Sequence, residues 1–129
     1  MAKKFSIKRD PIFAATVNLP SPGQDSVAVA FKFKWMDRKE LTAFNEDRYK
    51  FFTKEIPNYA KEDGVTGIDV AQKMIDYEFN QLKSIIHDWD IEEEFNDESL
   101  MALVESGSQL PASIVDGYLQ AYDKAREGN

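Results

Sequence analysis

The sequence contains no cysteine, and this absence removes several classes of chemistry. Disulfide frameworks, thiolate nucleophiles and cysteine-ligated zinc or iron–sulfur sites all need a residue that the chain lacks. His87 is the single histidine, so sites that require two histidines are excluded as well. The six glycines are scattered and form no phosphate-binding loop. We therefore expect no catalytic residues, no metal and no cofactor, and we interpret the protein as a non-enzyme.

Long hydrophobic runs are also absent. The longest uncharged, mostly apolar run covers residues 11–24 and is interrupted by Asn18, Pro20 and Pro22, so it is too short and too broken to span a bilayer. The N-terminus turns polar by Lys8 and has no apolar signal region. These features predict a soluble protein without a membrane partner, and the lack of cysteine fits a cytoplasmic location.

Positive charge is missing from one long stretch of the chain. Residues 84–123 hold 10 acidic and no basic side chains, whereas residues 1–54 hold 11 basic and 6 acidic ones, and the net charge is −7. Affinity for nucleic acid comes largely from Lys and Arg that neutralise phosphates, so we expect no nucleic-acid partner. The acidic cluster does not follow a calcium-binding EF-hand loop, because Glu93 stands where that loop needs glycine and Ser99 where it needs glutamate.

Length and composition predict one domain over residues 1–129. A chain of 14.8 kDa with 43% hydrophobic residues can bury a self-supporting core without a disulfide bond or a structural metal. We expect the α+β class, with an antiparallel β-hairpin region at residues 1–36 and a predominantly helical region of about four helices at residues 37–129.

The hairpin is predicted by two runs of alternating apolar residues. Residues 26–35 place Val27, Val29, Phe31, Phe33 and Trp35 on one face, and residues 13–19 alternate in the same way. Between these runs lies a segment rich in proline and glycine, which is typical of a turn. Phe5–Lys8 is the candidate for a third, shorter strand. Because a lone hairpin is marginally stable, helices or another subunit must cover its apolar face.

Four helices are predicted downstream from caps and apolar spacing. The first covers about residues 38–56 and is expected to be broken by Pro57, Asn58 and the stretch to Gly64. The second carries a stripe from Ile68 to Trp89 at intervals of three and four residues, which would place it in the core or at a subunit contact. After a loop at residues 90–96, a short helix covers residues 97–106, and a last helix with Pro111 in its first turn ends near Gly128.

Aromatic side chains are numerous, with nine phenylalanines, five tyrosines and two tryptophans, and aromatic anchors dominate protein contacts. Phe51, Phe52 and Tyr77 are the hardest to place on a single inward face. The candidate partner-binding residues are these three together with Trp35, Trp89, Glu92, Glu93 and Glu94. The opposing interpretation is that the tryptophans fill the core and that the glutamates form a solvated loop. His87, beside Asp88, is explained by a favourable contact at the end of a helix.

The order of several short motifs resembles the tail assembly chaperones of phages with long non-contractile tails. The resemblance rests on Phe31–Trp35, on Asp37–Leu41, on the Ile86–Asp90 junction, and on the tail from Ser99 through Leu110-Pro111, Ile114 and Tyr118 to Gly128-Asn129. It covers nearly the whole chain and includes no catalytic signature.

The resemblance implies a non-enzymatic role in virion morphogenesis. Such a chaperone would bind the tape measure protein, keep it soluble until the tail tube polymerises around it, and be absent from the mature virion. It would act in the cytoplasm of the infected bacterial host and assemble as a homo-oligomer. A longer frameshift product would contact the major tail tube protein.

Two other functions stay open from the residues themselves. The stretch without Lys or Arg is compatible with an acidic DNA-mimic inhibitor of a host nuclease, if its carboxylates are spaced like phosphates. A small enzyme is the weakest alternative, because nucleophiles, bases and cofactor motifs are so few.

Overall fold

Residues 4–8 and 11–127 are described by the structure, a computed structural model. Strands β1 (Ile12–Ser21) and β2 (Gln24–Lys34) form the expected antiparallel hairpin, with Val17 opposite Val29. Gly23 in the connecting turn has a φ of 72°, a conformation that residues with side chains rarely adopt. The alternation predicted for β2 is confirmed, since Val29, Phe31 and Phe33 are buried while the residues between them are exposed.

The third strand is β3 (Ile86–Trp89), which pairs with β2 and gives the strand order β1-β2-β3. The expectation of a third strand at Phe5–Lys8 was wrong, because these residues form no strand and are exposed. The expected helical stripe up to Trp89 was also wrong at its end, since helix α3 (Gly67–Ile85) ends before β3 begins. Hydrogen bonding to the second edge of β2 decides the conformation of these last four residues.

His87 accordingly lies on the exposed face of β3 and not at a helix C-terminus, which corrects the expectation for this residue. Ile86 and Trp89 are the buried residues of the strand and pair with Phe33 and Phe31. Simple alternation would put Ile86 and Trp89 on opposite faces, but the register shifts between Lys32 and Phe33. His87 is the extra residue of this irregularity, and both His87 and Asp88 are exposed.

A long helical segment follows the β1–β2 hairpin and consists of α1 (Arg38–Lys50), the π-helical turn η1 (Phe51–Glu55) and α2 (Ile56–Ala60). The predicted capping box is present, with Asp37 and Glu40 bonding each other's backbone N–H groups at 2.9 and 3.0 Å. The helix was expected to end before Pro57, but it continues to Ala60 and ends inside the expected stretch up to Gly64. The π-helical turn places Pro57 in the first turn of α2, where a residue without an N–H is tolerated.

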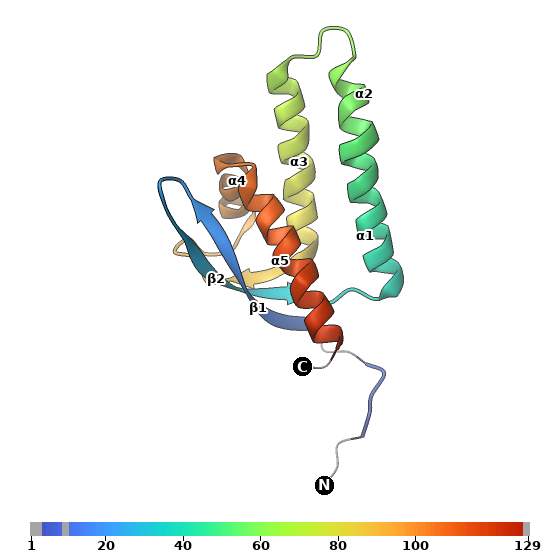
Figure 1. The fold of residues 1–129 in the computed structure, drawn as a ribbon, viewed down its shortest axis with the longest axis vertical. Coiled ribbons are helices and arrows are strands. Elements are labelled where there is room, and N and C mark those ends of the chain that lie inside the picture. The colour runs from blue at the N-terminus through green and yellow to red at the C-terminus, as the bar shows by residue number, and fades with distance from the viewer. Residues whose placement is uncertain (1–3, 9–10, 128–129) are drawn as a thin grey trace.

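Helix α3 runs beside α1 and α2, and the two segments form a helical hairpin that extends past the sheet (Figure 1). The remaining helices agree with the predictions. Helix α4 (Asp97–Ser106) has the expected bounds, and α5 (Gln109–Arg126) begins after Ser108 with Pro111 in its first turn. The helical and strand content of the described residues confirms the α+β class.

One hydrophobic core lies between the inner face of the sheet and helices α3, α4 and α5. Leu82 and Ile85, at the C-terminal end of α3, are fully buried, whereas Ile68 at its start is 82% exposed. Only the end of the predicted stripe is therefore core. Tyr118 and Tyr122 of α5 donate hydrogen bonds of 2.7 Å to backbone oxygens of Lys34 and Met36, which fixes α5 to the end of β2.

Candidate functional site

An apolar cleft of about 400 Å³ lies between the turn end of the β-hairpin and helix α4. Its walls come from four parts of the chain that are distant in sequence. The apolar lining consists of Leu19, Pro20, Val27, Val29, Trp89, Ile91, Ala102, Leu103 and Leu110, and the polar lining of Ser21, Glu93, Ser99 and Ser106. Apolar walls with few polar groups are typical of a surface that accepts hydrophobic side chains.

Val27 is a large apolar side chain of this cleft that is exposed, with 54% of its surface accessible. It continues the apolar face of β2, but it lies close to the turn, where the hairpin extends beyond α5 (Figure 1). Leu103 on α4 and Leu110 on α5 line the cleft and are half-buried. The core thus opens to solvent at this end of the sheet.

The floor of the cleft is held by Trp89. Its indole N–H donates a hydrogen bond of 2.8 Å to the backbone oxygen of Glu93, and its ring meets the Phe95 ring edge-on at 5.0 Å. The Ser99 hydroxyl donates to the backbone oxygen of Glu94 at 2.6 Å. These bonds tie the loop of residues 90–96 to β3 and α4, so that Glu93 lines the cleft and its neighbours are exposed.

The structure therefore brings two of the predicted partner-binding residues, Trp89 and Glu93, to one cleft, with Glu92 and Glu94 in the same loop. Trp89 is only 9% exposed, so it acts here as a wall and not as a protruding anchor. Sequence reasoning missed Val27, Leu103 and Leu110 as site residues. No sequence signal separates them from core residues, because their exposure depends on where the hairpin extends past the helices.

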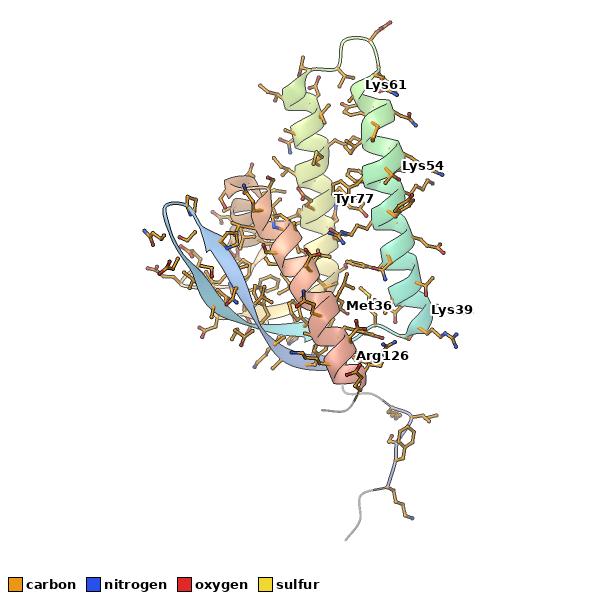
Figure 2. All side chains as sticks on the ribbon, viewed as in Figure 1. Met36, Lys39, Lys54, Lys61, Tyr77 and Arg126 are labelled. Atoms are coloured by element: carbon orange, nitrogen blue, oxygen red, sulfur yellow. The ribbon has the colours of Figure 1, made fainter. Side chains whose placement is uncertain are left out.

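A second group of predicted residues, Phe51, Phe52 and Tyr77, meets inside the helical hairpin. The rings of Phe51 and Tyr77 are stacked at 3.7 Å, and Phe52 meets both rings edge-on. The Tyr77 hydroxyl donates a 2.6 Å hydrogen bond to Asp47 on α1, and Figure 2 shows Tyr77 directed from α3 toward the other helical segment. Burial and this carboxylate partner raise the pKa of Tyr77 well above its usual value. These aromatic faces join the two halves of the hairpin.

Trp35, the remaining predicted residue, follows directly after the end of β2. Its ring is stacked on the Tyr122 ring at 4.3 Å, and it is half-buried. The predicted aromatic residues thus fall into three separate places and do not form one continuous surface.

Within residues 4–8 and 11–127, no group of three or more His, Cys, Asp or Glu side chains is placed to hold a metal ion. In the same ranges, no helix has both the length and the hydropathy that a membrane crossing requires. The cleft combines apolar walls with one carboxylate and three hydroxyl groups, an arrangement suited to binding another polypeptide.

Comparison with known proteins decides the family. The chain matches the phage tail assembly chaperone family over residues 1–129. The chain belongs to the phage tail assembly chaperones. The resemblance seen in the sequence is therefore confirmed. No curated protein and no solved structure gives a significant match, so the cleft of this tail assembly chaperone is interpreted from its own residues.

Proposed function

We propose that this chaperone binds the tape measure protein and keeps it soluble until tail tube subunits polymerise around it. The single observation that supports this proposal most strongly is the apolar cleft at the open end of the sheet, in a chain that belongs to the tail assembly chaperones. Family membership also favours a chaperone over the acidic nuclease inhibitor considered from the sequence.

The cleft suits a helical client that presents one apolar stripe. An amphipathic helix binds by placing side chains from successive turns in such a groove. Each buried leucine-sized side chain contributes about 1.5–3 kcal/mol, so a few anchors suffice for a reversible complex. Glu93 at the cleft and the exposed Glu92 and Glu94 would add electrostatic selectivity, since rim charges mainly govern association rate and partner choice.

The remaining parts of the proposal follow the family. The protein acts by binding and catalyses no reaction, and several copies associate on one client. A longer product of the same reading frame, made by a frameshift, recruits the major tail tube protein. The chaperone works in the cytoplasm of the infected host and is released before the virion is complete.

Co-expression tests the central claim. The chaperone and the tape measure protein of the same phage are produced together, and soluble client is measured with and without the chaperone. We expect the client to move from the insoluble to the soluble fraction and to co-purify with the chaperone. A client that stays insoluble, with no complex recovered from correctly folded chaperone, would refute the proposal.

A further inference from the structure

Strand β1 leaves one edge of the sheet open. The N–H of Trp35 donates to the backbone oxygen of Pro11 at 2.7 Å, which marks this pair as a hydrogen-bonded one. Hydrogen-bonded and non-hydrogen-bonded pairs alternate in an antiparallel ladder. Ala14, Thr16 and Asn18 therefore direct their backbone N–H and C=O groups away from β2. Within residues 4–8 and 11–127, no strand pairs with this edge.

A groove of about 610 Å³ runs along the open edge, between β1 and helix α5. Residues 13–18 of β1 form one wall. The other wall consists of α5 residues that recur every three or four positions, namely Ser113, Asp116, Gly117, Gln120, Ala121, Lys124 and Ala125. A strand added beside β1 would lie about 5 Å from the β1 backbone. Its inward side chains would face the α5 wall of the groove.

Residues Phe5–Lys8 have the pattern of such a strand. Phe5 and Ile7 are apolar and alternate with Ser6 and Lys8, and they are 79% and 88% exposed. Figure 1 shows this segment lying away from the sheet and helices. The period of two would place both apolar side chains on one face of an added strand, toward α5, and the two polar side chains on the solvent face.

Pro11 disfavours pairing of this segment with β1 of its own chain. A proline confines the residue before it to extended backbone conformations. A two-residue hairpin turn instead requires positive φ angles. A tight turn directly before Pro11 is therefore unfavourable, and the β1 edge is more readily paired by the segment from another copy.

We propose that residues 5–8 of one copy add as a fourth strand to the β1 edge of a second copy, with Phe5 and Ile7 in the groove beside α5. This proposal deepens the self-association that forms part of the proposed function. The donated segment and the accepting edge are different surfaces, so the contact is heterologous. Each copy both donates and accepts, which allows a head-to-tail row of copies along an extended client.

Cysteine pairs test the contact directly, because the chain has no cysteine of its own. Ser6→Cys is mixed under oxidising conditions with Ala14→Cys, Thr16→Cys or Asn18→Cys, each prepared separately. We expect a mixed covalent dimer with at least one of the three edge positions. Ala30→Cys is the matched control. Ala30 lies on β2, one strand further from the open edge, and is the residue that pairs with Thr16 of β1.

Charge substitution supplies an independent measurement. Phe5→Asp with Ile7→Asp changes only exposed side chains, so circular dichroism should stay unchanged. We expect self-association measured by sedimentation to weaken at least about tenfold, because two apolar side chains lose their burial.

The outcomes separate this proposal from the proposed function. Oligomers that persist in the double aspartate variant, or edge positions that give no mixed dimer, would overturn strand addition while self-association stands. Cross-linking within the single chain Ser6→Cys with Thr16→Cys, independent of concentration, would overturn exchange between copies. A wild-type chain that stays monomeric would refute self-association and strand addition together, and solubilisation of the client is judged separately.

Discussion

Gly117 of α5 packs directly on Val17 of β1: a Cβ atom added at Gly117 would lie 2.6 Å from Cγ2 and 2.8 Å from Cγ1 of Val17. The absence of a side chain at Gly117 is what lets the helix approach the sheet so closely. This contact sets the distance between α5 and β1, and therefore also the shape of the groove along the open sheet edge.

Gly117→Ala should destabilise the fold by about 1–3 kcal/mol, because the added methyl group forces the helix and the strand apart. The better helix propensity of alanine offsets up to about 1 kcal/mol of this cost. Urea unfolding measures the difference. Gly67→Ala is the control, since nothing lies within 4 Å of a Cβ there. Val17→Ala removes the two clashing methyl groups, so a double variant that shows no coupling between the sites would contradict the explanation.

Glu78 on α3 is only 8% exposed, and burial raises the pKa of its carboxyl, while the nearby charge of Arg48 acts in the opposite direction. A folded-state pKa above the unfolded value means that the folded protein binds the proton more tightly. The contribution of Glu78 to stability is present below its unfolded pKa and is lost as the pH rises through the folded pKa.

Glu78→Gln should therefore raise the melting temperature at pH 7 and change it much less at pH 4. Gln81, three residues further along α3, has a buried Nε2 without a hydrogen-bond partner among the described residues, so a second polar group is buried close to Glu78. Thermal unfolding at both pH values makes the comparison. Glu105→Gln, at an exposed position on α4, serves as the control. A larger stabilisation at pH 4 than at pH 7 would show that the sign is wrong.

Val27→Glu should weaken client binding about tenfold, because it places a charge in the wall of the apolar cleft and removes an apolar side chain that the bound client would cover. Its effect on stability should be small, since the side chain is 54% exposed. The measurement is the amount of tape measure protein that co-purifies. Ile68→Glu changes an even more exposed apolar residue at the start of α3 and should leave binding unchanged. Equal losses for both variants would argue against the cleft.

Replacing Glu92, Glu93 and Glu94 together with glutamine should weaken client binding at low ionic strength, and the difference should vanish at about 0.5 M salt, where exposed charges are screened. The fold should be unaffected, because the three side chains are exposed. Binding measured across a salt series tests this expectation. A loss that is independent of salt would mean that the loop makes close contacts and acts by more than its charge.

Local patterns in the sequence predicted most elements of this chaperone because caps and periodicity act over a few neighbouring residues. The alternation around Phe31 indicates a strand without reference to other elements, and the capping residues around Asp37 specify a helix start. The π-helical turn before Pro57 and the strand at Ile86–Trp89 were not predictable in this way. The strand depends on pairing with the second edge of β2, and the π-helical turn begins at Phe51, whose ring stacks on Tyr77 of α3.

The candidate site shows the same division. Aromatic content and acidic charge singled out Trp89 and Glu93, but the sequence alone does not place them beside Val27 and Leu103. Apolar stripes look alike whether they end in a core, a cleft or an interface, because the same alternation serves all three. The sequence by itself determined the α+β class, the hairpin, the capping box at Asp37 and the family. Only the tertiary structure decided which apolar residues stay in contact with water, because exposure depends on how far each element extends past the elements packed against it.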